Sequence, residues 1–221
     1  MEVYNSEQEQ VEALKAWWDK NGRSSLVALA VFLLSVVGWQ QWDGHRKGIA
    51  EAASTHYQKM VEMMGKDSTN AMEAGRALIA NYPDSIYAVM ASMTMAKLAV
   101  EQKDLDGAAA HLRSAMQQSD QPELAELARL RLARVELAQG NHDAALATLA
   151  GGETSAGSDE LRGDILLAQG SVDAARDAYT KALEGYSETV DKREMVQMKL
   201  DDLAVTTTVA STEASAESPA E

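Results

Sequence analysis

Apolar residues recur along most of this chain with the spacing of helices. From Ile49 to Leu203 they return every three or four positions, and the Val-, Ile- and Thr-rich alternation that is typical of strands is absent from the sequence. Alanine is abundant, whereas proline occurs three times and phenylalanine once. The pattern predicts an all-α protein that is helical nearly everywhere.

One segment departs from this pattern because it has no polar face. Residues 24–42 contain no charged side chain and are bounded by Arg23 and Asp43. About 20 apolar residues, at a rise of about 1.5 Å each, cross the hydrocarbon core of a membrane. The ends of the segment carry tryptophans, which favour the membrane–water boundary: Trp17, Trp18, Trp39 and Trp42. We therefore predict a transmembrane signal anchor at 24–42.

Two other interpretations of this segment remain open. A buried core helix usually keeps one polar face, which this segment lacks. A cleaved signal peptide has an apolar run of about 7–15 residues and a nearby small-x-small site. The nearest such site, Ala50-Glu51-Ala52, lies well beyond the run. The retained anchor is favoured over both.

The flanks of the segment do not reveal its orientation. Three basic residues precede it and three follow it within a similar distance, so the positive-inside comparison is tied: Lys15, Lys20, Arg23, Arg46, Lys47 and Lys59. Residues 1–23 are too few for a domain. Within them, Val11–Lys20 has the composition of a short amphipathic helix that lies at the membrane surface.

The rest of the chain contains internal repeats. Three segments align: Ala96–Met116, Ala133–Gly152 and Gly163–Leu183. Each has a helix with a small residue, a turn, and an Asp-x-Ala that opens a second helix: Asp106/Ala108, Asp143/Ala145 and Asp173/Ala175. The spacings of 37 and 30 residues average near the period of tetratricopeptide repeats, about 34. The sequence predicts a tetratricopeptide-like solenoid over 43–205.

Small residues explain why such helices pair. Two antiparallel helices approach closely where side chains are small, and we expect the first helices to contribute Ala96, Ala133 and Gly163 and the second helices the alanines of Asp-x-Ala. Gly140 and Gly170 are expected to end first helices in the left-handed conformation. A weaker pair should precede the array, with Asp84 or Ser85 capping the next helix. Glu188–Leu203 looks like a capping helix, and 206–221 has the composition of a disordered tail.

Charge and residue content exclude several functions. The net charge is −14, so the chain should repel nucleic acid, and it contains no cysteine. The four histidines have no metal-ligand spacing, and no phosphate-binding loop or nucleophile motif is present. We predict a non-enzymatic protein that needs no metal, cofactor or small-molecule substrate.

The order of several stretches carries a family resemblance that covers residues 1–205. The stretches are MEVYNSEQEQVEALKAWWDKNG before the apolar segment, GWQQWDGHR at its exit, LRLARVELAQGNHDAALATL, DELRGDILLAQGSVDAARDAY, and the ending MVQMKLDDLAV. In these the chain resembles the ancillary SecYEG translocon subunits of Gram-negative bacteria, the YfgM type.

This resemblance implies a place and a set of partners. It implies a single-pass protein of the bacterial inner membrane, with residues 1–23 in the cytoplasm and the repeats in the periplasm. It also implies association with the SecYEG translocon and with a membrane-anchored periplasmic chaperone of the PpiD type, as an adaptor that helps exported chains leave the channel. No catalytic residues come with it. The alternative is a general envelope scaffold that uses the same repeats in another membrane complex.

A candidate binding groove follows from the repeat register. In tetratricopeptide arrays the first helix of each pair lines the concave surface. Counting back from Asp-x-Ala predicts these groove residues: Met93, Lys97, Leu130, Arg134, Glu160 and Asp164. Apolar members would contribute burial and charged members orientation. Plain solvation of these charged faces is the alternative interpretation.

Overall fold

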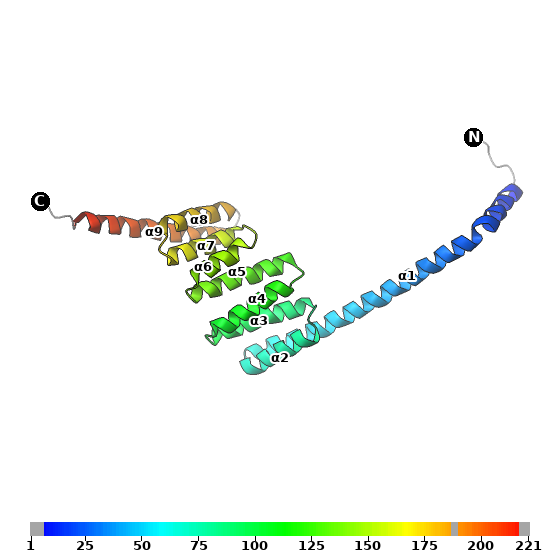
Figure 1. Cartoon of the computed structure of the whole chain (residues 1–221), viewed down its shortest axis with the longest axis horizontal. Helices are drawn as coiled ribbons and strands as arrows, with labels where there is room; N and C mark the ends of the chain where they lie inside the picture. Colours follow the sequence, from blue (N-terminus) through cyan, green and yellow to red (C-terminus); the bar gives the residue numbers. More distant parts are fainter. Residues whose placement is uncertain (1–6, 187–189, 217–221) are drawn as a thin grey trace, which may run out of the picture. The chain divides into compact units, whose positions relative to one another are not determined.

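A computed structural model of the chain describes residues 7–186 and 190–216, and within these ranges every regular element is an α-helix (Figure 1). The helices are α1 (Glu7–Met64), α2 (Ser68–Asn81), α3 (Ile86–Glu101), α4 (Leu105–Gln118), α5 (Pro122–Ala138), α6 (His142–Ala150), α7 (Ala156–Ala168), α8 (Val172–Gly185) and α9 (Val190–Ala216). The predicted all-α fold is confirmed. The chain divides into two units, Met1–Ala52 and Ala53–Glu221.

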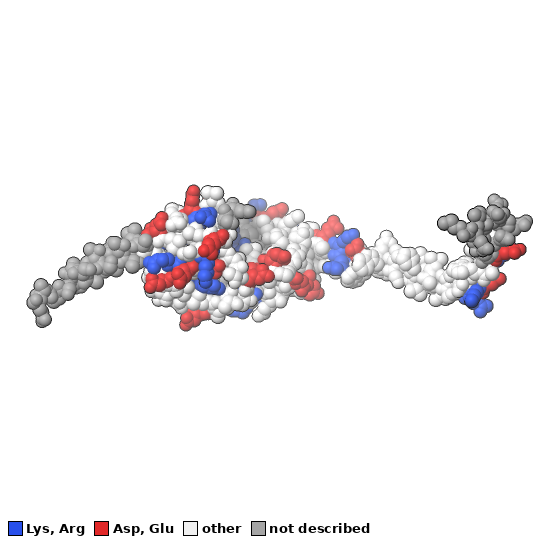
Figure 2. All heavy atoms as spheres, turned by 90° about the horizontal axis from the view of Figure 1, so that it is seen from above, with Lys and Arg blue, Asp and Glu red and all other residues white. Residues whose placement is uncertain are grey.

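The first unit is the N-terminal part of α1. It contains the one helix in the described residues that is long and apolar enough to cross a membrane. Figure 2 shows this stretch as a length of helix without charged side chains. Leu29, Phe32 and Leu33 are all more than half exposed, which does not fit a buried core helix. The segment 11–20, expected as a separate short helix, is the first part of α1, which runs through Gly22 without interruption.

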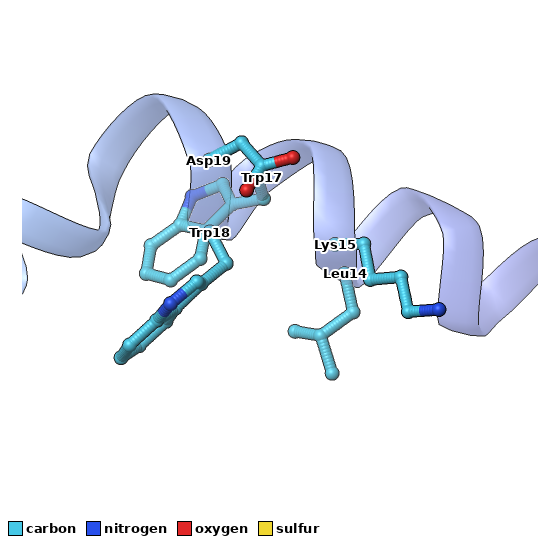
Figure 3. Close-up of a pocket in the computed structure, with 5 residues that line it drawn as sticks. All are labelled: Leu14, Lys15, Trp17, Trp18 and Asp19. Carbon is cyan, nitrogen blue, oxygen red and sulfur yellow. The ribbon is translucent and has the colours of Figure 1, made fainter.

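A shallow hollow lies on the side of α1 before the apolar stretch. Its walls are Leu14, Lys15, Trp17, Trp18 and Asp19, and Figure 3 shows Leu14 and Trp18 extending from the same side of the helix. The two indole centroids lie 6.5 Å apart. Both tryptophans are about half exposed, at 50% and 51%. Large half-exposed indoles next to an apolar helix are typical of a membrane boundary.

The second unit is a stack of helix pairs. The end of α1 packs on α2 and α3 through Met60, Leu78 and Met95, which are all buried. The pairs α3/α4, α5/α6 and α7/α8 follow, and successive helices lie side by side in Figure 1. This confirms the predicted tetratricopeptide-like solenoid.

The register of the repeats is also as predicted. Ala108, Ala145 and Ala175 of the Asp-x-Ala motifs have no exposed surface, and Ala96 and Ala133 opposite them are 2% and 0% exposed. The small side chains let the helices approach closely, so that a larger residue would be overpacked. The small residues therefore position the two helices of each pair.

The turns between the paired helices repeat one conformation. Gly140 and Gly170 have φ of +76° and +80°, the left-handed geometry that glycine adopts without strain. Lys103 occupies the equivalent turn after α3 and has φ of +63°. Ser85, rather than Asp84, caps α3, because its hydroxyl accepts a hydrogen bond from the Ala88 amide at 3.2 Å.

The C-terminal helix is longer than expected. α9 packs on α8 through Val196 and Leu203, which are 0% and 4% exposed, so the helix expected over 188–203 is present from Val190. It continues to Ala216, whereas composition indicated a disordered tail over 206–221. Alanine and glutamate in this segment are compatible with helix once a preceding helix provides the nucleus. Residues 187–189 and 217–221 lie outside the described ranges.

Candidate functional site

The six predicted groove residues lie on three consecutive first helices, but their surroundings differ. On α3, Met93 is 6% exposed and belongs to a core cluster with Leu112 and Leu132. Lys97, one turn later, is exposed and forms an ion pair with Glu101 at 3.7 Å. Met93 therefore contributes mainly packing, while Lys97 presents a charge to solvent.

On α5 the two predicted residues also separate into a packing and a surface position. Leu130 is partly buried against the cluster that contains Ala133 and Leu149. Arg134 is exposed. Arg131, which the repeat register did not single out, lies one turn before Arg134, and its Nη1 is 3.7 Å from the Met93 sulfur. This contact places α5 beside the predicted surface of α3.

The α7 residues form a polar network with α9. Lys199 Nζ donates hydrogen bonds to Glu160 Oε1 at 2.9 Å and to Asp164 Oδ1 at 2.7 Å. Two phenols complete the network, since Tyr186 donates to Glu160 Oε2 at 3.0 Å and Tyr179 donates to Asp164 Oδ1 at 2.8 Å. The Lys199 ammonium also lies 5.6 Å from the centroid of the Tyr179 ring.

The network changes the acidity of its members in a consistent direction. Burial, together with the hydrogen bond to Glu160 and its charge, raises the pKa of Tyr186 to about 12, although Arg134 opposes this rise. Burial and the hydrogen bond to Asp164 raise the pKa of Tyr179. Burial lowers the pKa of Lys199, but hydrogen bonds to Asp164 and Glu160 outweigh it and leave the pKa raised. The phenols thus stay protonated and the lysine stays cationic near neutral pH.

We call the charged side chains of the three first helices, together with Lys199 of α9, the first-helix strip: Lys97, Arg131, Arg134, Glu160, Asp164 and Lys199. The buried Met93 is not part of this surface, but its sulfur contacts Arg131. Met93 and Arg131 link α3 to α5. α5 also contacts α7 directly, and the charge of Arg134 opposes the rise in the pKa of Tyr186, whose hydroxyl donates to Glu160. Sequence analysis missed Arg131 and Lys199. The charge of Arg131 three residues before Arg134 is a usable signal, whereas nothing in the sequence pairs Lys199 with α7.

The strip consists mainly of charged side chains. Lys199 is held as a cation by two carboxylates, so it is not a nucleophile. No group of three His, Asp or Glu side chains suited to a metal ion occurs among the residues that the structure describes. On α3 and α5 these charged side chains lie next to buried apolar residues of the core clusters.

Comparison with known proteins identifies the family. Residues 15–205 match the family described as tetratricopeptide repeat-like domain. A protein of Escherichia coli (strain K12) named ancillary SecYEG translocon subunit is 31% identical, and the alignment covers 93% of this chain and all of that protein. The protein of the same name from Aggregatibacter actinomycetemcomitans is 33% identical over 91% of this chain and all of its own length.

Among solved structures, the chain is similar to a thermophilic TPR protein of Thermus thermophilus. The TM-score is 0.49 at 20% identity, with 69% of this chain and 81% of that chain covered. The sequence matches are the informative ones, because they run through the apolar segment, the repeats and the helix that follows them. The chain belongs to the tetratricopeptide repeat-like family and, within it, to the ancillary SecYEG translocon subunits.

Proposed function

We propose that this protein is a non-enzymatic, membrane-anchored adaptor that associates with the SecYEG translocon and binds a partner polypeptide on its first-helix strip. The observation that carries the proposal is the strip itself: exposed basic side chains on α3 and α5, followed by partly buried carboxylates on α7 that bind Lys199 of α9. Repeat solenoids use such extended surfaces to bind other proteins. Relatives with the name of translocon subunits support the choice of complex.

The partner polypeptide belongs to one of two classes. One is a membrane-anchored periplasmic chaperone of the PpiD type, and the other is an exported chain as it leaves the channel. Both require the repeats on the periplasmic side, with residues 1–23 in the cytoplasm. In this arrangement 24–42 anchors the protein in the membrane and the repeats of 43–205 bind the partner polypeptide.

The topology has a direct test. A reporter that is active only in the periplasm, fused after Val205, should be active, and a reporter that works only in the cytoplasm should be silent at the same site. The opposite pair of results would contradict the proposed orientation. Reporters inserted between Arg23 and Ser24, with the anchor and the repeats retained after them, serve as the matched control, because they should give the inverse pattern.

The association has a second test. Full-length protein isolated in mild detergent should co-purify SecY and the chaperone. Lys97→Glu with Arg134→Glu should weaken chaperone capture while the chain still folds, because exposed single charges usually change stability by less than about 0.5 kcal/mol. Lys181→Glu is the control, since Lys181 is exposed on the second helix α8.

Two outcomes would redirect the proposal. Normal capture by the doubly reversed protein would move the contact to the apolar helix or to the second helices. Failure of the unmodified protein to co-purify SecY would favour an envelope scaffold in another membrane complex.

A further inference from the structure

The first-helix strip has an acidic end that is internally neutralised. Glu160 and Asp164 each accept a hydrogen bond from Lys199 and another from a phenol, at 2.7 to 3.0 Å. The Lys199 side chain is 29% exposed, so the cation is partly shielded from solvent. A cation from another molecule would have to displace an ammonium that already has two carboxylate partners.

The other end of the strip is basic and can accept new partners. Arg131 and Arg134 lie one turn apart on α5, and both are exposed. Neither guanidinium forms an ion pair with any side chain of the described residues, although acidic residues outnumber basic ones by 34 to 20 in the chain. The contact of Arg131 is the Met93 sulfur, a weak acceptor.

Lys97 extends the basic end onto α3. Its ammonium is 3.7 Å from Glu101, and both side chains are more than half exposed, at 65% and 54%. Such a solvated pair contributes little and exchanges readily with a competing carboxylate. The strip therefore presents two guanidinium groups without an ion-pair partner in the described residues and one loosely paired ammonium, beside a neutralised acidic end.

We propose that the strip selects an acidic, extended segment of the partner polypeptide, with Arg131 and Arg134 as the principal charge contacts. The inference rests on the proposed function, in which this strip is the binding surface. Guanidinium groups bind carboxylates through two parallel hydrogen bonds, which gives orientation as well as attraction. Lys199 has a supporting role, because without it Glu160 and Asp164 would repel the same acidic segment.

A basic partner segment fits the strip less well. It would meet two arginines at one end, and at the other end it would compete with Lys199 for carboxylates that are already satisfied. Breaking the internal bonds would leave Lys199 partly buried without its partners, which is unfavourable. The charge pattern thus distinguishes the two kinds of partner.

The test uses the full-length chain in mild detergent and three labelled peptides of equal length, in which alanine alternates with Glu, Gln or Lys. The Glu peptide should bind, and added salt should weaken its binding. Arg131→Gln with Arg134→Gln should lower the affinity for the Glu peptide about tenfold, which corresponds to about 1.4 kcal/mol for the two contacts together. Lys181→Gln, which removes one exposed positive charge on α8, should leave the affinity unchanged.

Changes at the acidic end should act in opposite directions. Lys199→Gln should weaken binding of the Glu peptide and allow the Lys peptide to bind, because Glu160 and Asp164 are then released. Glu160→Gln with Asp164→Asn should tighten binding of the Glu peptide. This second variant keeps the test valid if Lys199→Gln unfolds the C-terminal helices, which circular dichroism would reveal.

Equal binding of the Glu and Gln peptides, or equal affinity of the Glu peptide for the unmodified and double-arginine proteins, would overturn the acidic preference. Chaperone capture by the same arginine variant separates the two ideas. If capture is lost but the Glu peptide never binds, the strip is the binding surface and the acidic preference is wrong. If capture is unchanged, the strip is not the contact, and the proposed function fails with it.

Discussion

The second and third repeats make the same helix contact with different side chains. In the second repeat Ala133 of α5 and Leu149 of α6 share a core cluster and are 0% and 2% exposed. At the equivalent positions the third repeat has Gly163 on α7 and Tyr179 on α8. A Cβ atom at position 163 would lie 2.4 Å from Cε1 of Tyr179, so the tyrosine ring fills the space that a methyl group occupies one repeat earlier.

Because Tyr179 stands where the second repeat has Leu149, the third repeat has a hydroxyl group among its packed side chains. The Tyr179 ring is buried, but its hydroxyl reaches Asp164, and the ring lies near the Lys199 ammonium. Leu149 has no group that does this. The last repeat therefore differs from its neighbour where α9 packs against it. The replacement of Ala and Leu by Gly163 and Tyr179 provides the polar groups that contact Lys199 of α9.

The largest effect should come from enlarging the alanines that both repeats share. Ala145→Leu and Ala175→Leu each insert three carbon atoms at a position with no exposed surface. Each should destabilise the chain by about 1–3 kcal/mol, measured by thermal unfolding of the full-length protein. The control Ala110→Leu, at an exposed position of α4, should change little. Unchanged melting of the buried variants would contradict the register of the repeats.

The second effect tests the exchange of Gly163 and Tyr179 directly. Gly163→Ala should destabilise by about 1–2 kcal/mol, because overpacking against the ring exceeds the gain in helix propensity. Adding Tyr179→Leu recreates the pair of the second repeat and should cost less than the sum of the two single changes. Strict additivity, measured as a double-mutant cycle, would mean that the two positions do not interact.

The third effect isolates the phenol. Tyr179→Phe keeps the ring and removes the hydrogen bond to Asp164, which should cost about 1 kcal/mol. Chemical denaturation of the full-length chain measures it. Tyr87→Phe is the matched control, because the Tyr87 ring is partly buried and packs beside the Tyr57 ring, with the centroids 5.9 Å apart. If both variants lose the same free energy of unfolding, the hydrogen bond to Asp164 is not the cause of the loss.

A smaller effect concerns the turn of the first repeat. Lys103 has the left-handed backbone that the other two repeats give to glycine. Lys103→Gly should stabilise the chain by about 0.5–1 kcal/mol, since a left-handed conformation is unfavourable for residues with a Cβ atom. The reverse change, Gly140→Lys, should destabilise by a similar amount. Stabilities that move in the same direction would contradict the equivalence of the turns.

The smallest effect should appear at alkaline pH. Tyr186 ionises near pH 10 in the unfolded chain, but its pKa is raised to about 12 in the folded chain. Between these two pH values the folded chain keeps the Tyr186 proton and the unfolded chain loses it. The contribution of Tyr186 to the free energy of unfolding is therefore complete below pH 10 and declines as pH rises toward about 12. Tyr186→Phe should flatten this decline, which denaturation midpoints across the pH range would show. An unchanged slope would mean that Tyr186 contributes nothing to it.

Sequence patterns predict the repeats well because their causes are local. Asp-x-Ala, the small residues opposite it and the glycines of the turns lie within one helix pair, so their spacing reveals the register. The polar network was not predictable in this way. Lys199 is separated from Glu160 by 39 residues and from Asp164 by 35, and their approach depends on how α9 packs on α8. The groove prediction therefore included Glu160 and Asp164 but not Lys199, which binds them.

The same distinction explains the helix ends. Gly22 lies between 11–20 and the apolar stretch, but α1 continues through it, because one glycine inside a helix costs only about 1 kcal/mol. At the other end, the composition of 206–216 is compatible with both coil and helix. A helix that is already anchored through Val196 and Leu203 can extend into such a segment.

One hydrogen bond between neighbouring repeats occurs twice, at equivalent positions of the array. The Gln139 amide at the end of α5 donates to Asp106 at the start of α4 at 2.7 Å, and Gln169 at the end of α7 donates to Asp143 of α6 at 2.9 Å. The acceptor is the Asp of each Asp-x-Ala. The next one, Asp173, has a side chain that is 96% exposed and contacts Arg176 of its own helix. A duplicated unit inserted before α9 would therefore meet an accessible acceptor for its own glutamine. The array thus ends on an acceptor of the kind that joins its earlier repeats.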